Sequence, residues 1–354
     1  MAFAIAVSIL LLMVFQTIFY SVTESGRLVF SGPLNHMTVV SRGDNGIINP
    51  NVLSKIKESP DIERIVPILL SNTDYFHVFG NLNLPIYYVS NNNLNYVLEH
   101  LGLELVEGRF PEQDKSEVLL DERTLKNKDK RLGDYIGRDV DPNEKLFGKY
   151  KIVGVLKGEC LMGITVTDEA TILKNNSRYL LFATAGRLDS LNKLISGTSS
   201  EDAKFQTKED GRRDFEEDIE LMDMVSTIIA AVVIFIMSFA AGNSSYAQYF
   251  SRKYEFATLL SIGYSRAKIL LRAAWEILIT YIIGLILGII LVLIAKLALK
   301  VLIFDPNGYP FILFQLEGLS KVFIIPLCTV IFSLIPAWWT LSRVDQVEII
   351  EKYE

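Results

Sequence analysis

The stretch Ile277–Ala295 reads ILITYIIGLILGIILVLIA and contains no charged residue. A helix that crosses a membrane needs about 20 consecutive, mostly apolar residues, because the hydrocarbon core offers the backbone no hydrogen-bond partner. A surface helix of a soluble protein would instead keep one polar face. The stretch therefore predicts a membrane-spanning helix.

Three other runs have the same character, and they are Ala2–Tyr20, about Met224–Ala241 and Val322–Leu341. The alternative for the first run is a cleaved signal peptide. This run lacks a basic start, its apolar stretch is too long, and no A-x-A site follows it. These features disfavour cleavage. We expect four membrane-spanning helices, one before a long polar segment and three after it.

The overall composition averages two different parts. The 354 residues are 50% hydrophobic and 21% charged, with a net charge of −6. The mean hydropathy is +0.30. Residues 21–222 hold 25 Lys and Arg against 32 Asp and Glu, a net of −7, whereas the rest holds 10 basic and 9 acidic residues. The negative charge disfavours nucleic-acid binding, and two cysteines are too few for a disulfide framework.

The polar segment is expected to be a mixed α+β domain. Its turns are marked by Gly133, Gly137 and Gly148. The β-branched and apolar runs that predict strands are Met37–Arg42, Ile62–Ile68, Glu117–Leu120 and Lys151–Leu156. The stretches that predict short helices are Asn51–Glu58, begun by Pro50, and Leu94–Leu101. Cys160 in this domain is expected to be a small buried residue.

Motifs that carry chemistry are absent from the sequence. The three histidines have no metal-ligand spacing, and Asp139-x-Asp141-x-Asn143 opens like a calcium loop but has Glu144 where glycine is required. No metal site is predicted. No G-x-x-x-x-G-K-[ST] motif occurs, so we expect the chain not to be an enzyme and not to hydrolyse ATP by itself.

The orientation in the membrane follows from the short loops. The loop between the second and third apolar runs is basic, whereas Val301–Ser320, between the third and fourth, contains no Lys or Arg. The basic residues of the first loop are Arg252, Lys253, Arg266, Lys268 and Arg272. By the positive-inside rule this loop is cytoplasmic. Both termini are then cytoplasmic and the polar domain is extracytoplasmic.

The basic loop predicts a short amphipathic helix, a turn and a second helix. Phe256, Leu259 and Leu260 have helical spacing, Gly263 suits a helix end, and Ser265 suits the cap of the next helix. Taken as a cytoplasmic anchor alone, the loop would lie on the lipid headgroups.

The same loop resembles that of a known family. The residues Arg252-Lys253-x-Glu255-Phe256-Ala257 and Ser261-Ile262-Gly263-Tyr264-Ser265-Arg266 are similar to the R-x-x-E-φ-x-x-L-x-x-φ-G-x-S/T loop of the MacB/FtsX/LolC permeases, the type VII ABC transporters. Further stretches resemble the family in order along nearly the whole chain. They are Pro60–Pro67, Leu103–Phe110, Glu117–Leu120, Leu132–Gly137, Lys151–Val155, Glu276 with Gly284 and Gly288, and Arg343–Glu348.

This resemblance implies a permease subunit with a MacB-like domain. In the family the loop is a coupling helix that docks into a separate cytoplasmic ATPase, which binds ATP and Mg; the permease itself binds no cofactor. The implied partners are this ATPase, a second permease copy or paralogue in a dimer, membrane lipid and an extracytoplasmic accessory protein. The implied coupling residues are Arg252, Lys253, Glu255, Phe256, Leu259, Gly263, Ser265 and Arg266, and the implied residues of transmembrane packing or coupling are Glu276, Gly284 and Gly288.

The expected fold is thus a multi-pass protein of a bacterial cell membrane, with four transmembrane helices and an α+β extracytoplasmic domain inserted between the first and the second. The expected boundaries are 1–22, 222–243, 273–303 and 321–341 for the helices, 23–221 for the domain, 244–272 for the coupling loop, 304–320 for an outer loop and 342–354 for the tail. By resemblance, ATP-driven motion passes to the outer domain by mechanotransmission and displaces or exports a peptide, antibiotic, lipid or lipoprotein.

Two alternatives remain at this point. A receptor without an ATPase would need a cytoplasmic output module, and the longest cytoplasmic stretch, about 30 residues, is too short for an independent domain. A transmembrane regulator or sensor of the FtsX type, which controls an extracellular partner, resembles the loop but typically has a smaller outer domain.

Overall fold

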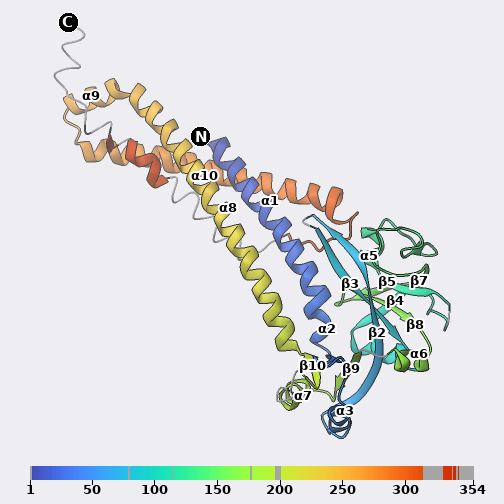
Figure 1. The fold of residues 1–354 in the computed structure, drawn as a ribbon. Helices are drawn as coiled ribbons and strands as arrows, with labels where there is room; N and C mark the ends of the chain where they lie inside the picture. The colour runs from blue at the N-terminus through green and yellow to red at the C-terminus, as the bar shows by residue number, and fades with distance from the viewer. Residues whose placement is uncertain are drawn as a thin grey trace. The chain divides into compact units, whose positions relative to one another are not determined.

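The computed structural model describes residues 2–313 apart from 79, 114, 176–177 and 196–200, together with 330–336, 338–339 and 342. The chain forms two compact units. The helical unit comprises Met1–Tyr20, Leu221–Lys300 and Phe311–Glu354, and the α/β unit comprises Ser21–Glu220 and Val301–Pro310. Figure 1 shows the strands and short helices of the α/β unit and the long helices α1, α8 and α10.

The α/β unit follows the mixed pattern that the sequence predicts. Its strands are β1 (Thr38–Arg42), β2 (Ile62–His77), β3 (Gly80–Val89), β4 (Leu103–Gly108), β5 (Glu117–Asp121), β6 (Tyr135–Ile136), β7 (Tyr150–Gly158), β8 (Gly163–Val166), β9 (Arg178–Ala183) and β10 (Ala203–Gln206). Its helices are α2 (Gly32–Leu34), α3 (Pro50–Lys57), α4 (Asn91–His100), α5 (Glu122–Asn127), α6 (Glu169–Lys174) and α7 (Leu188–Ile195), and a π-helical turn, η1 (Arg27–Ser31), precedes α2. All four predicted strands and both predicted helices are present. Five of them differ from the prediction by a few residues at their ends, whereas β2 continues nine residues beyond the predicted end at Ile68.

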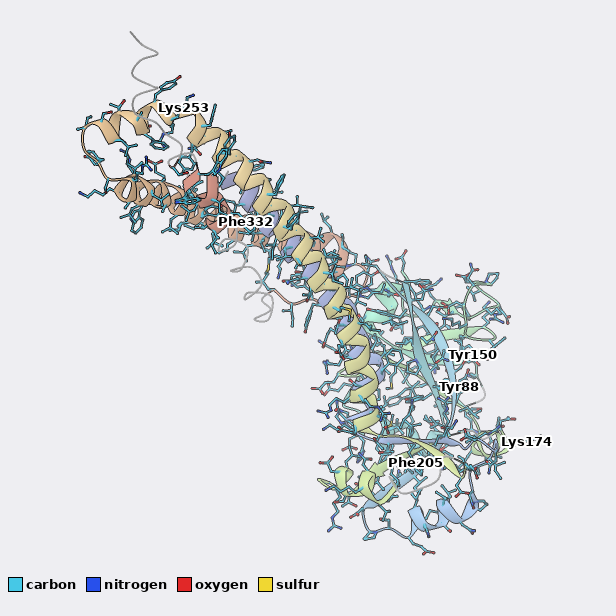
Figure 2. The ribbon with its side chains drawn as sticks, turned by 60° about the vertical axis from the view of Figure 1, so that its left-hand side comes forward. Tyr88, Tyr150, Lys174, Phe205, Lys253 and Phe332 are labelled. Atoms are coloured by element: carbon cyan, nitrogen blue, oxygen red, sulfur yellow. The ribbon has the colours of Figure 1, made fainter. Side chains whose placement is uncertain are left out.

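Among the described residues the strands join in the order β10-β1-β9-β2-β3-β8-β5-β7-β4, with β6 beside β7. The β3–β8 and β5–β7 pairs are parallel and the other pairs are antiparallel. The β2–β3 hairpin has the longest ladder, which pairs Leu69 with Tyr88 and His77 with Gly80 at its ends. Figure 2 shows Tyr88 of β3 beside Tyr150 of β7. The Tyr88 hydroxyl donates a hydrogen bond to the Tyr150 hydroxyl at 2.9 Å.

The core lies on both faces of this sheet. Side chains of successive strand residues point to opposite faces, so Leu119 of β5 joins one cluster while Val118 and Leu120 join another. Helix α4 covers the first face through Leu94, Val97 and Leu98. Strand β5 is buried along its whole length, which explains why Val118, Leu119 and Leu120 are apolar on both faces.

The stretch Leu103–Phe110, part of the family resemblance, has a structural role. Gly108 adopts a φ of +87° and lies so close to β7 that a Cβ atom would clash with the carbonyl of Val153. Arg109 then forms two hydrogen bonds with the Glu117 carboxylate, at 2.8 and 2.5 Å. These bonds hold the pKa of Glu117 below its ordinary value. The motif therefore fixes the end of β4 to the start of β5.

The segment that begins like a calcium loop is held by a lysine. Glu144, buried in the α/β unit, pairs with the buried ammonium of Lys128 and accepts a hydrogen bond from the Thr73 hydroxyl at 2.6 Å. A buried carboxylate needs such partners because its charge is costly to desolvate. Glu144 is thus a structural residue of this loop.

The helical unit is built from long apolar helices. They are α1 (Ala2–Gly26), whose last residues lie in the α/β unit, α8 (Lys208–Ser251), which begins there, α9 (Lys253–Ser261) and α10 (Arg266–Leu299), which continues into the π-helical turn η2 (Lys300–Phe304). Many large apolar side chains of α8 and α10 are exposed, such as Phe235, Phe239 and Ile294. In water such a surface would be unfavourable, and lipid contact removes this cost.

Three helical segments of the described chain are long and apolar enough to cross a membrane, namely Ile5–Leu34, Met224–Ser251 and Arg266–Phe304. The predicted fourth helix, 321–341, lies largely outside the described residues, although 330–336 are helical. The predicted tail, 342–354, also lies outside them apart from residue 342. Several extents differ from the sequence prediction: α1 continues to Gly26, α8 runs without a break from Lys208 to Ser251, and Val301–Pro310 belongs to the α/β unit.

Candidate functional site at the α8–α9–α10 turn

The helix, turn and helix predicted for the basic loop are present. Helix α9 ends in two capping bonds, from Gly263 N–H to the Leu260 carbonyl and from Tyr264 N–H to the Leu259 carbonyl, both 3.0 Å. This Schellman arrangement requires a left-handed residue, and Gly263 supplies it with a φ of +98°. The Ser265 side chain then caps α10 by accepting the N–H of Lys268. The sequence therefore fixes where the chain reverses.

One face of α9 is packed into the helical unit. Phe256, Ala257 and Leu260 are 5%, 3% and 9% exposed and share a core with Ile269 and Ile277 of α10. Burial of a large apolar side chain such as Phe256 or Leu260 stabilises the folded state by about 1.5–3 kcal/mol. Helix α9 is therefore seated on the transmembrane helices and is not a free arm.

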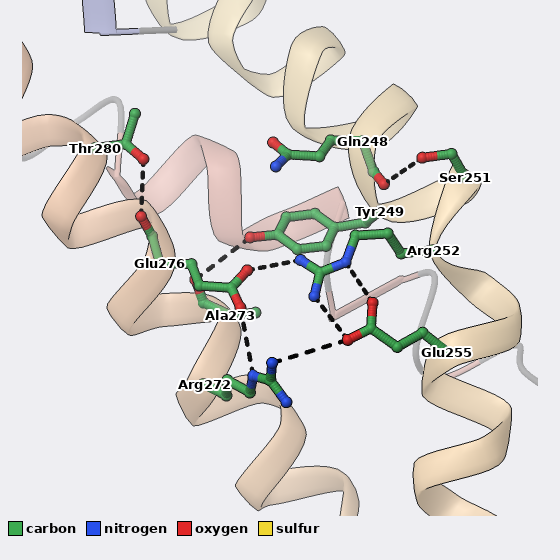
Figure 3. A network of polar contacts seen from close by, with 9 residues as sticks. All are labelled: Gln248, Tyr249, Ser251, Arg252, Glu255, Arg272, Ala273, Glu276 and Thr280. Atoms are coloured by element: carbon green, nitrogen blue, oxygen red, sulfur yellow. Dashed lines mark hydrogen bonds and ion pairs between the residues drawn. The ribbon is translucent and has the colours of Figure 1, made fainter.

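Four charged side chains connect α9 to α10 (Figure 3). Arg252 donates to both oxygens of Glu255 at 2.7 and 2.9 Å and to one oxygen of Glu276 at 2.6 Å. Arg272 lies 3.4 Å from Glu276 and 3.9 Å from Glu255. The order of charges alternates around the ring, so each carboxylate faces both cations. We call these four residues the charge clamp.

Hydrogen bonding makes Arg252 the centre of the clamp. Its guanidinium pairs with both carboxylates, and this raises the pKa of Arg252 and holds the pKa of Glu255 below its ordinary value. Arg252 is 25% exposed, whereas Arg272 is 60% exposed. Exposed ion pairs contribute only about 0.2–1 kcal/mol each. The clamp therefore acts chiefly by fixing the orientation of α9. The Tyr249 hydroxyl of α8 adds a hydrogen bond to the Ala273 carbonyl of α10 at 3.3 Å.

The tip of the loop is entirely exposed. Every residue from Ser261 to Lys268 is exposed, including Ile262 at 70% and Tyr264 at 52%. Lys253, labelled in Figure 2, lies over the rings of Phe250 and Tyr254 at about 5 Å. Apolar side chains held out by a rigid turn, with basic residues around them, form a surface suited to a protein partner.

The eight predicted coupling residues separate into four pairs. Phe256 and Leu259 pack inward, Arg252 and Glu255 belong to the charge clamp, and Gly263 and Ser265 shape the turn. The remaining two, Lys253 and Arg266, lie at the surface. The sequence reading did not include Ile262 and Tyr264 as contact residues, nor Arg252 as a partner of Glu276. The signal available in the sequence was the pair of large apolar residues on either side of a turn glycine.

The glycine pair of α10 packs against α1. A Cβ atom at Gly284 would lie 2.9 Å from the Ala2 carbonyl, and one at Gly288 would lie 3.2 Å from the Ala6 Cα. Small residues four positions apart let two helix backbones approach closely. The contact therefore gives this glycine pair a packing role between α1 and α10.

Comparison with known proteins identifies the helical part. Residues 227–345 match the model of the family described as FtsX-like permease C-terminal. This match includes α9, the turn and the charge clamp. Over these residues the C-terminal part of the chain is similar to the FtsX-like permeases. The predicted resemblance to the FtsX-like permeases is confirmed by this match.

Two solved structures are similar to the chain at low identity. The periplasmic region of MacB from Actinobacillus actinomycetemcomitans is 14% identical over 52% of this chain and 94% of that chain, with a TM-score of 0.31. The extracellular domain of the noncanonic ABC-type transporter YknZ from Gram-positive bacteria is 13% identical over 48% of this chain and 99% of that chain, with a TM-score of 0.29. A comparison with curated protein sequences gives no match.

Proposed function

We propose that the chain is the permease subunit of an ABC transporter and that the loop tip, residues 261–268, docks into a separate cytoplasmic ATPase. The observation that supports this most is the two-sided construction of the α9 turn. Its inner face is packed and clamped, while its outer face presents Ile262 and Tyr264 to solvent. A rigid projection can pass a displacement to the helices that carry it.

The proposal places the loop tip in the cytoplasm and the α/β unit outside the cell membrane, as the basic residues of the loop favour. Two copies of the permease, or one copy and a paralogue, would accompany two ATPase subunits. The exposed apolar faces of α8 and α10 offer room for a second copy and for lipid. ATP and Mg would be bound by the ATPase alone.

The work done by such a complex would be mechanical. Few spanning helices leave little room for an internal pore, whereas the α/β unit is large. ATP-driven movement of the α/β unit would therefore displace or export a substrate that is already outside, such as a peptide, an antibiotic, a lipid or a lipoprotein.

The test compares two exposed isoleucines. Ile262→Asp changes the loop tip, and Ile47→Asp makes the same change at a side chain that is 58% exposed in the α/β unit. Tagged full-length chains are purified from native membranes, and the ABC ATPase retained and its ATP hydrolysis are measured. We expect at least a tenfold loss of both for Ile262→Asp and no loss for Ile47→Asp. Equal retention by the two variants would show that the loop tip is not the docking site.

The second candidate is a transmembrane regulator that uses the same ATPase to control an extracellular partner. The observation that supports it is the assignment of Val301–Pro310 to the α/β unit, because a segment that follows α10 and packs there can pass a movement signal without any substrate being moved. Identification of the ATPase that co-purifies separates the two: a cell-division ATPase supports the regulator, and an ATPase of a transport system supports the permease.

A further inference from the structure

The segment that follows α10 is folded into the α/β unit. Helix α10 continues through η2, and residues Val301–Pro310 make their contacts with the α/β unit. Phe304 is 1% exposed although it lies in a connection between two apolar stretches. A connection of this kind normally runs over the surface and tolerates change. Its burial therefore points to a specific role.

Two hydrogen bonds hold the segment by its backbone. The Tyr75 hydroxyl, at the end of β2, donates to the Gly308 carbonyl at 2.7 Å. The side-chain amide of Asn127, which is the last residue of α5, donates to the Asn307 carbonyl at 3.0 Å. The same Asn127 side chain also bonds the backbone N–H and carbonyl of Phe76, at 2.7 and 2.8 Å. One amide thus joins the segment to β2.

Aromatic packing adds to these bonds. The Tyr309 ring stacks on His77 with centroids 4.4 Å apart, and Phe304 meets Tyr309 edge to face at 6.2 Å. Such ring pairs stabilise beyond the area they bury. The Nε2 atom of His77 lies 3.4 Å from the hydroxyl of Ser21, which is in the part of α1 that belongs to the α/β unit. The ends of α1, β2 and the segment after α10 therefore meet at one place.

Gly308 is required for the approach. Its φ is +67°, and a Cβ atom there would clash with the backbone carbonyl of Arg123 in α5. Any other residue at this position would strain the backbone conformation and would push the segment away from α5. Substitution at this position consequently releases the segment without touching the helical unit.

We propose that residues 304–309 are a tether that makes α10 the mechanical link between the α9 turn and the β2–β3 hairpin. The inference rests on the proposed function, because it needs an ATPase that moves the turn. Helix α10 is continuous from its Ser265 cap to Leu299, carries Arg272 and Glu276 of the charge clamp near one end, and leads into the tether at the other. A displacement of the turn then reaches the hairpin through a rigid helix and a fixed joint.

The first measurement needs no ATPase. Amide hydrogen exchange of residues 304–309 is followed in the full-length chain in detergent, for the native protein, Gly308→Val, Tyr75→Phe and Asp305→Asn. We expect protection in the native protein and in Asp305→Asn, whose side chain is exposed. We expect its loss in Gly308→Val and roughly a tenfold decrease in Tyr75→Phe, which removes one hydrogen bond and keeps the ring. An unprotected native segment would overturn the tether whatever the function of the chain.

The second measurement uses the complex with the co-purified ATPase, trapped with ADP and vanadate. In the native complex and in Asp305→Asn, trapping should change exchange at residues 69–89 of the hairpin. In Gly308→Val and Tyr75→Phe this response should fall at least threefold, while ATPase retention and basal hydrolysis stay native. An undiminished response in both variants overturns the tether and leaves the proposed function intact. Absence of any ATPase from the native chain overturns the proposed function, and the mechanical role of the tether with it.

Discussion

His77 occupies a site that excludes its charged form. The Val78 N–H donates to His77 Nδ1 at 2.8 Å, which requires that nitrogen to be unprotonated. Nε2 is then left to carry the proton toward the Ser21 hydroxyl. The ring is 9% exposed and stacks on neutral Tyr309. Burial lowers the pKa of His77 from its ordinary 6.5 to about 4.

This lowered pKa predicts a pH-dependent stability. Between pH 6.5 and pH 4 the unfolded chain binds a proton at His77 and the folded chain does not. Stability therefore decreases as the pH falls through this window and is unaffected by His77 above it. Thermal unfolding of the full-length chain in detergent should show a smaller decrease for His77→Gln than for the native protein. Identical pH profiles for the two proteins would contradict the assignment.

Individual residues differ in how far the sequence could place them. Gly263 and Ser265 were predicted correctly because a turn glycine and a cap depend on neighbours a few positions away. Arg252 was recognised as part of a motif, but its bond to Glu276 crosses 24 positions. The Tyr75 bond to Gly308 crosses 233 positions, and no local pattern carries that information.

At the scale of elements, the contact between α1 and α10 depends on the absence of side chains. The two glycines of α10 face Ala2, Ile5, Ala6 and Ile9 of α1 at distances that leave no room for a methyl group at Gly284. Periodicity predicted the two helices, because a run of apolar residues identifies a span without reference to its neighbours. Which faces touch depends on shape, and the sequence left that open.

The packing role of Gly284 can be separated from its helix propensity. Alanine favours a helix over glycine by about 1 kcal/mol wherever it is tolerated. At Gly242 of α8 the nearest atom to a Cβ would be 3.6 Å away, an ordinary contact, whereas at Gly284 it would be 2.9 Å. We expect Gly242→Ala to be neutral or stabilising and Gly284→Ala to be less stable than it by about 1–3 kcal/mol. Equal unfolding midpoints in detergent would exclude tight packing at Gly284.

At the scale of the whole molecule, charge is distributed by unit and predicts a topology. Residues 21–222 have a net of −7, while five of the ten basic residues outside this range lie between Arg252 and Arg272, around the α9 turn. Lys and Arg are retained on the cytoplasmic side of membrane proteins. The α9 turn and the α/β unit should consequently lie on opposite sides of the membrane.

Single cysteines can test this topology because the native thiol of the α/β unit is inert. Cys160 is fully buried and burial raises its pKa to about 12, so almost no reactive thiolate forms near pH 7. With Cys328 replaced by serine, Ile47→Cys and Tyr264→Cys introduce one exposed thiol in each unit. A membrane-impermeant maleimide should label residue 47 in intact cells or spheroplasts, and residue 264 only after permeabilisation. The reverse pattern would show the opposite topology. Labelling of both residues 47 and 264 in intact cells would place both units outside. Either result would remove the cytoplasmic docking surface on which the proposed function depends.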